Sequence, residues 1–378
     1  MTIVDRYLLF NFFKIFLICL VSFAGLFIVI HLFTNLDDLV EAGEKNGGLA
    51  NMLFDFYGPR VLDIFSRMSG MLVLISAIFS LSMMQKRREM TAIEAAGIPK
   101  SRLVRPIFFA AIVVLGLSVV NREVWLPQVK DKLVRTPENW EDSGRVPMNF
   151  QKDPFSGLLI RGGEIIIESE RITQPDVQIP MHLDEQISRI HGEVGVIKEA
   201  KNRRPNGLWL IGVDIPENLM EMPSMQIEGK TVVFSPKDHK WLKPDQCYIA
   251  CDLDVQEMAY GKQLASYATL KEMMASLRKP RLWFGHQQQV QVHSRILQPM
   301  MDITLVLLGL PFVISKSEQN IFTAAGFCLL VVCAVQLTVL GCNSLGAYSL
   351  IRPAALAAWL PLIIFFPMSV LSMRRLKA

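Results

Sequence analysis

The sequence predicts a helical membrane protein with six transmembrane helices, three on each side of an inserted antiparallel β domain of jelly-roll-like type. Two observations predict this fold. Both ends of the 378-residue chain contain long runs without charged residues, and charges, proline and glycine return between them. The overall composition, with 51% hydrophobic and 20% charged residues, is also too apolar for an ordinary water-soluble protein.

The six spans follow from the uncharged runs. A helix needs roughly 20 apolar residues, within a range of about 17 to 25, to cross the hydrocarbon. Three suitable runs precede residue 127 and three follow residue 290, and only one of them contains a charged residue, Asp302. The runs are Ile15–Phe33, Met68–Met84, Pro106–Asn121, Ile296–Ile314, Ile321–Ile351 and Pro353–Met373.

Three of these runs need comment. The first exceeds the ~7 to 15 residues of a signal-peptide core and has no A-x-A-like site after it, so a retained helix is predicted. The third lengthens if Arg122 snorkels to the interface. The fifth is too long for one straight span, and its polar end "GCNSLGAYSL" is predicted to be a loop.

The distribution of Lys and Arg predicts the orientation. Basic residues concentrate before the first span, between the second and third, and after the sixth, whereas the first outer loop is acidic. By the positive-inside rule both termini are cytoplasmic, and the β domain lies on the outer side of the membrane. The net charge of +4 is mostly this topology signal and gives no reason to invoke nucleic acid.

The central region reads as short strands. Stretches such as "GLLIRGGEIIIESERI" and "QISRIHGEVGVIKEA" alternate with period two and are separated by turn residues. An amphipathic helix in "YATLKEMMASLRKP" and a polar connector, "GHQQQVQVHSR", are predicted to follow the strands. The resulting division is a first helical part over 1–126, the β domain over 127–292 and a second helical part over 293–378.

Motifs for catalysis, cofactors and metals are absent from the sequence. It has no G-x-x-x-x-G-K-[ST] loop, H-E-x-x-H or C-x-x-C, so we predict no enzyme, no cofactor and no ATP site within the chain. On one strand Cys247 and Cys251 would lie about 13 Å apart, beyond the ~7 Å limit for a disulfide. Packing is the predicted role of the six cysteines, and a disulfide between these two stays open only if the chain bends.

The charged stretch "MMQKRREMTAIEAAGIPKSRLVRP", residues 83–106, lies between two predicted spans. Helix formers follow Arg88, Gly97 can supply a left-handed cap and Pro99 stops the helix. A short cytoplasmic helix is therefore predicted within 86–97. It is either a solvated loop helix beside basic residues that fix orientation, or a coupling helix inserted into a groove on a separate ATPase.

The chain resembles the LptF/LptG permease family, the membrane subunits of an ABC transporter that extracts lipopolysaccharide from the inner membrane. The resemblance is carried by "VDRYLL", "KRREMTAIEAAGIPKSRL", "SRILQPMMDITLVLLGLPF" and "PAALAAWLPLIIF". It covers nearly the whole chain, and "DRY" favours the LptG side.

The resemblance implies several partners. They are a second six-helix permease subunit, a dimer of a cytoplasmic ABC ATPase, lipopolysaccharide or a related glycolipid, and periplasmic jelly-roll bridge proteins that pair with a strand of the β domain. It also assigns the ATPase contact to Glu89, eight positions before the motif glycine. The predicted ATPase-coupling residues are Arg88, Glu89, Met90, Ile93, Ala96 and Gly97.

A second set of residues is predicted to face the substrate, because polar groups are costly within reach of the bilayer and need a partner or water. Each has a structural alternative, such as an i,i+4 pair between Asp63 and Arg67, or an interfacial anchor. Family members often carry a lysine near the outer end of the first span, where this chain has none before Lys45. The predicted substrate-facing residues are His31, Thr34, Arg67, Arg295 and Asp302.

The alternative class is a non-transporting membrane protein, either a mechanotransmission subunit of FtsX-like type or a scaffold whose outer domain binds a partner. A three-plus-three layout disfavours the four-span FtsX plan. An intramembrane enzyme would need a paired nucleophile and base, which the spans lack.

Overall fold

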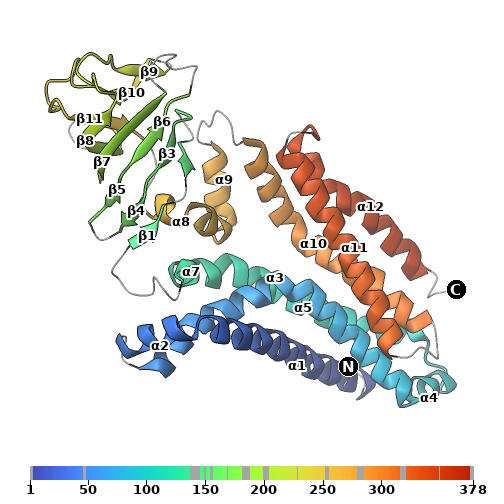
Figure 1. The fold of residues 1–378 in the computed structure, drawn as a ribbon. Coiled ribbons are helices and arrows are strands. Elements are labelled where there is room, and N and C mark those ends of the chain that lie inside the picture. The colour runs from blue at the N-terminus through green and yellow to red at the C-terminus, as the bar shows by residue number, and fades with distance from the viewer. Residues whose placement is uncertain are drawn as a thin grey trace.

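A computed structural model shows two groups of long helices and a β-sheet domain that lies at one end of them (Figure 1). The N-terminus, the C-terminus and the short helix α4 lie toward the other end of the helices. The described residues are 3–45, 48–136, 145–148, 150–153, 156–167, 169–180, 188–198, 204–227, 229–251, 255–278, 285–315, 321–348 and 350–374.

The N-terminal third of the chain forms the first group of helices, together with short helices at their ends. The C-terminal third forms the second group. The first set comprises α1 (Ile3–Thr34), α2 (Leu36–Lys45), α3 (Leu49–Lys86), α4 (Glu89–Ala95), α5 (Lys100–Val120), the π-helix η1 (Asn121–Trp125), α6 (Leu126–Gln128) and α7 (Lys130–Val134). The second group comprises α10 (Gly285–Ser315), α11 (Ile321–Ala347) and α12 (Ala354–Arg374). Two shorter helices, α8 (Val255–Ser266) and α9 (Leu270–Arg278), precede it and lie beside the sheet (Figure 1).

Among the described residues, five helices are long and apolar enough to cross a membrane: α1, α3, α5 with its continuation to Gln128, α11 and α12. A sixth long helix, α10, contains 31 residues and packs on α3, α5, α11 and α12. The chain is therefore a membrane protein with helical parts on both sides of a β domain.

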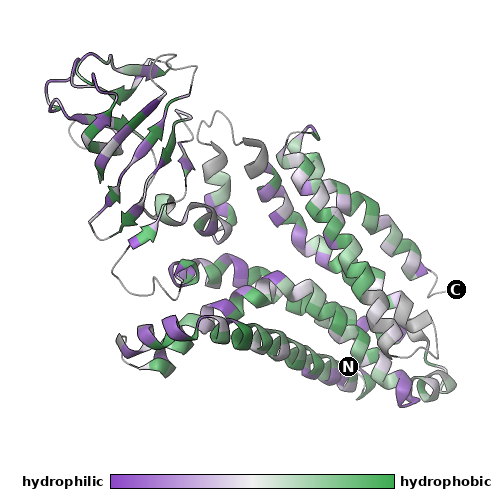
Figure 2. Cartoon of the chain, in the orientation of Figure 1, coloured by the Kyte–Doolittle hydropathy of each residue, from purple (hydrophilic) through white to green (hydrophobic). Residues whose placement is uncertain are grey.

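Helix α3 forms the centre of the helical core. In its most apolar stretch 67% of the residues are buried, against 11% in α1, so α1 packs along one side and turns most of its side chains outward. Figure 2 shows α1 as apolar along nearly its whole length. Such a surface is stable in lipid or against another membrane helix, and not in water.

Three segments predicted to be loops or connectors contain helix. Helix α11 continues to Ala347 through most of "GCNSLGAYSL", where the side-chain amide of Asn343 donates to Ser294 Oγ on α10 (3.1 Å). The predicted connector "GHQQQVQVHSR" is the first part of α10, where Val290 and Val292 are buried. The acidic loop after the first span likewise contains helix α2.

The described strands form one connected sheet in which every pairing is antiparallel, as predicted. Its main path is β1-β4-β5-β7-β8-β11-β10-β9, and β2 and β3 join through β6 to the first residues of β7. The strands are β1 (Arg145–Pro147), β2 (Gln151–Lys152), β3 (Leu159–Arg161), β4 (Glu164–Ile166), β5 (Arg171–Thr173), β6 (Asp176–Gln178), β7 (Arg189–Lys198), β8 (Gly207–Ile215), β9 (Met225–Ile227), β10 (Lys230–Phe234) and β11 (Gln246–Ala250).

Period-two alternation builds the core of the sheet domain. Leu208 and Leu210 on β8 and Cys247 and Ile249 on β11 are buried on one face. Trp209, between the two leucines, packs on the other face with Tyr248. Met258 of α8 also belongs to this core, so α8 is part of the sheet domain.

The two cysteines of the sheet domain, Cys247 and Cys251, are buried and are not joined by a disulfide. The Sγ of Cys247 donates to the carbonyl of Phe234 (3.3 Å), and burial raises the pKa of its thiol to about 12. Because the thiolate is the reactive form, Cys247 is expected to resist alkylation by iodoacetamide at pH 8 in the folded protein and to react once urea unfolds it. Peptide mass spectrometry measures this directly, and a peptide pair linked by a Cys247–Cys251 disulfide would contradict it.

Candidate functional site

Helix α4 projects from the turn between α3 and α5, at the end of the helices away from the sheet (Figure 1). Arg88 begins the helix from a left-handed conformation, φ 58°, which costs a non-glycine residue about 1 to 2 kcal/mol. At the other end Gly97 has φ 79°, and the Ile98 amide donates to the Ile93 carbonyl (3.3 Å). This is the glycine cap that the sequence predicted.

The two faces of α4 differ. Met90 is only 4% exposed and lies in the helical core, and Ile93 packs against the same core. These two side chains therefore anchor α4 to the membrane helices. The outward face carries small side chains, which would let another backbone come close; its exposed residues are Thr91, Ala92, Ala95, Ala96 and Gly97.

Glu89 lies at the edge of this outward face. Its Oε1 accepts a hydrogen bond from the Tyr7 hydroxyl of α1 (3.1 Å) and lies 3.8 Å from Arg87 Nη1. Arg87 in turn donates to the Tyr7 oxygen (3.4 Å). The carboxylate is thus held by α1 and by the turn after α3, while its Oε2 has no hydrogen-bond partner among the described residues.

The residues predicted to face the substrate lie at the sheet end of the helices and in α10. Arg67 Nε donates to both oxygens of Asp63 (2.8 and 2.9 Å), which confirms the predicted i,i+4 pair, and its side chain remains 60% exposed. His31 Nδ1 lies 3.1 Å from the Tyr57 hydroxyl. Thr34 bonds the carbonyl of Ile30 within its own helix (2.8 Å).

Arg295 and Asp302, the other two of these residues, are enclosed by neighbouring helices. The side chain of Arg295 is 10% exposed and donates to Glu123 Oε1 (3.2 Å) and Met273 Sδ (3.2 Å). Asp302 packs against Gly70 of α3, where a β-carbon would overlap its carboxylate. The structure therefore brings Arg295 together with residues far away in sequence, and its side-chain hydrogen bonds within the described part of the chain do not reach His31, Thr34 or Arg67.

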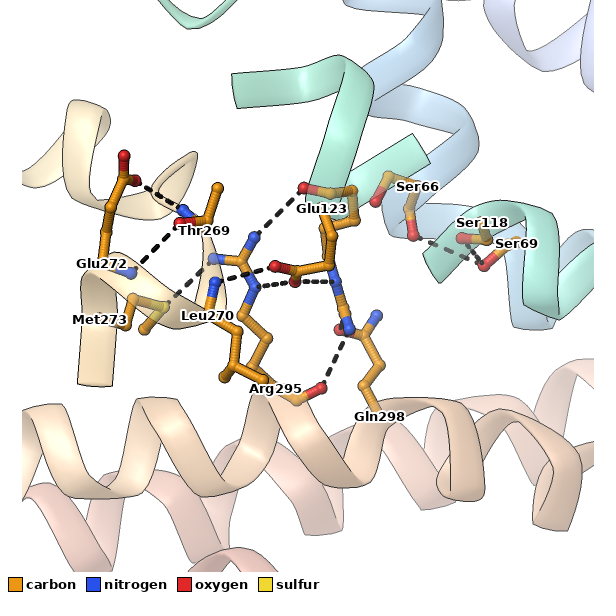
Figure 3. A network of polar contacts seen from close by, with 11 residues as sticks. Ser66, Ser69, Ser118, Glu123, Thr269, Leu270, Glu272, Met273, Arg295 and Gln298 are labelled. Atoms are coloured by element: carbon orange, nitrogen blue, oxygen red, sulfur yellow. Dashed lines mark hydrogen bonds and ion pairs between the residues drawn. The ribbon is translucent and has the colours of Figure 1, made fainter. Parts of the chain in front are cut away.

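Figure 3 shows the polar cluster around Arg295, and sequence reasoning missed its other members. Arg122 donates to Gln298 and to the carbonyl of Arg295 (3.0 Å), and Glu123 accepts from the amide of Leu270 at the start of α9 (2.8 Å). The available signal was the adjacent charge pair Arg122–Glu123 directly after an uncharged span. Arg122 bonds α10 and does not snorkel.

The described residues contain no group of three or more His, Cys, Asp or Glu side chains that could hold a metal ion. The two polar sites instead share the chemistry of contact surfaces. One site is the exposed small-residue face of α4 beside Glu89. The other is the charge cluster around Arg295 and Glu123, which joins neighbouring helices.

Comparison with curated proteins finds no matching sequence. The model of one family does match, and it covers residues 6–375, nearly the whole chain. The chain accordingly belongs to the family of the lipopolysaccharide export system permease LptF/LptG, whose members are transporter components and not enzymes.

Proposed function

We propose that the chain is one of two permease subunits of an ABC transporter that extracts lipopolysaccharide, or a related amphipathic glycolipid, from the bacterial inner membrane. It has six spans, cytoplasmic termini and a periplasmic β domain of jelly-roll type, with parts over 1–126, 127–292 and 293–378. A separate cytoplasmic ATPase dimer supplies the energy, and the β domain passes the lipid to periplasmic bridge proteins.

The observation that carries this proposal is that α4, in a chain of this family, has one face packed on the helical core and one exposed face of small residues. A small-residue face beside Glu89 is exposed, while Met90 and Ile93 fix the helix to the core from which α3 and α5 extend. A short helix anchored in this way can transmit force from a partner to α3 and α5, because its inner face is packed against the helical core. Within the coupling segment 86–97, Glu89, Ala96 and Gly97 meet the ATPase, Arg88 sets the turn, and Met90 and Ile93 act as anchors.

In the proposed mechanism, closure of the ATPase upon nucleotide binding brings the α4 helices of the two permease subunits together and narrows the lipid cavity between them. Each acyl CH₂ group exposed to water would cost about 0.8 kcal/mol. The lipid therefore needs an apolar path, for which the inward face of the β domain is suited. Thr34 and the exposed Arg67 are the most accessible of the predicted substrate contacts.

The four-span mechanotransmission alternative is disfavoured because five described helices already meet the length and apolarity of a span, and the scaffold alternative is separated by the partners that the chain brings. Purification of the chain from its native bacterial membrane tests the choice. We expect an ABC ATPase, a second permease subunit of the same family and a glycolipid identifiable by mass spectrometry to accompany it. An intact, monodisperse chain that brings neither an ATPase nor a glycolipid would rule the transporter out.

A further inference from the structure

We propose that the α8–α9 junction, residues 266–273, carries movement of the membrane helices into the sheet domain, and that Glu123 is its positioning residue. This inference rests on the proposed function, because it names the place where a driven helical part would move the β domain.

The junction contacts α3, the turn η1 that follows α5, and α10. The Tyr267 hydroxyl lies 3.2 Å from Arg67 Nη2 and 3.3 Å from Asp63 Oδ2, both on α3. The amide of Leu270 donates to Glu123 on η1 (2.8 Å), and Met273 Sδ accepts from Arg295 on α10 (3.2 Å).

Glu123 is the centre of these contacts (Figure 3). One oxygen accepts from the start of α9, and the other lies 3.2 Å from Arg295 Nε and 3.7 Å from Arg122 Nε. Its side chain is 27% exposed, and those of the two arginines are 14% and 10% exposed. Ion pairs that are largely shielded from water and hydrogen-bonded hold their geometry better than surface pairs.

The π-helical turn η1 sets the direction of this carboxylate. Its hydrogen bonds run from the Leu126 amide to the Asn121 carbonyl, one residue further than in an α-helix, and such turns occur frequently at functional sites. Asn121 is buried and donates to the Leu62 carbonyl of α3 (2.8 Å), which fixes the turn to the central helix. Glu123 is thus linked to α3 through Asn121 and to α10 through Arg295, so a shift of α3 relative to α10 would move its carboxylate.

On the other side of the junction, α8 is packed into the sheet domain. Helix α8 contacts β4 and contributes Met258 and Ala259 to the core of the sheet domain, so a displacement of the junction displaces the sheet. Helix α9 packs on α10. The junction is thus a packed connection through which a movement of the membrane helices would reach the sheet domain.

The test uses the whole transporter complex in lipid nanodiscs and compares wild type with Glu123→Gln, which keeps the shape of the side chain and removes its charge. The first readout is hydrogen exchange of residues 255–278 with and without trapped nucleotide. We expect a nucleotide-dependent change in wild type and its loss in Glu123→Gln. Tyr267→Phe, which removes the bonds to Asp63 and Arg67, is expected to weaken the change in the same direction.

The second readout is lipid delivered to the bridge protein per ATP hydrolysed. It is expected to fall about fivefold or more in Glu123→Gln while ATP hydrolysis stays within about twofold of wild type, since coupling free energies between sites typically give 5- to 150-fold effects. Lys132→Gln is the matched control, because it breaks an exposed ion pair with Asp55 (3.0 Å) between α7 and α3. It is expected to behave as wild type in both readouts.

The inference is overturned if the exchange of residues 255–278 in wild type does not respond to nucleotide, or if Glu123→Gln responds as wild type does. A parallel loss of ATP hydrolysis and delivery in both Glu123→Gln and Tyr267→Phe would also overturn it, because the defect would then not lie between ATP hydrolysis and movement of the sheet domain. Failure of the proposed function looks different: wild type would deliver no lipid at all, while the exchange readout would still report on the junction.

Discussion

Replacement of Glu89 by lysine is expected to uncouple the chain from its ATPase. The Glu89 side chain lies beside the exposed small-residue face of α4 and is 32% exposed, so a basic group of a partner can approach this edge. A lysine would also stand next to Arg87, 3.8 Å from the present Oε1. Like charges at an interface cost several kcal/mol, so we expect at least ~30-fold weaker association with the ATPase and loss of lipid export.

The measurement is co-purification of the ATPase with the chain, together with lipid export in cells. Glu89→Gln separates charge from shape, since glutamine still accepts the hydrogen bond from Tyr7; an intermediate loss is expected. The matched control is Glu44→Lys, the same charge reversal at an exposed position of α2 near the sheet end. If Glu89→Lys assembles, turns over nucleotide and exports lipid as wild type does, the coupling role of α4 is wrong.

Local signals explain what the sequence could predict. The end of α4 was readable because Gly97 and Pro99 act within one turn of the helix, and the Asp63–Arg67 pair because its spacing places both on one helical face. The antiparallel strands were readable from period-two alternation, as in "GLWLIGVDIP", which forms β8. Each of these features depends on residues a few positions apart.

Features that depend on contacts between residues distant in sequence could not be predicted from the sequence. Glu123 meets Leu270 across 147 positions, and no pattern in either segment announces the other. The helical end of α11 looked like a loop because its Asn and Ser residues suit turns, yet Asn343 finds Ser294 on α10. Likewise the inward direction of Met90 and Ile93 follows from the helices that α4 packs on, and not from α4 itself.

A single added methyl group at Gly346 is expected to separate three helices of the second group. Gly346 lies on α11, and a β-carbon there would overlap the methyl group of Ala357 on α12 and lie 2.9 Å from Val290 Cγ2 on α10. Small residues permit such close approach of helices in membranes. The Ala357 methyl group cannot rotate away, so the backbones must part, and overpacking typically costs about 1 to 3 kcal/mol.

For Gly346→Ala we therefore expect the thermal unfolding midpoint of the purified chain in detergent to fall by roughly 2 to 3 °C, the shift that a loss of ~2 kcal/mol produces in a chain of 378 residues with an unfolding entropy of about 2.1 cal/mol/K per residue. Gly341→Ala is the matched control, because it lies on the same helix with nothing within 4 Å of the added carbon. Since alanine favours helix over glycine by about 1 kcal/mol, this control is expected to equal or exceed wild type. Equal midpoints for the two variants would show that α11 does not pack against α12 through Gly346.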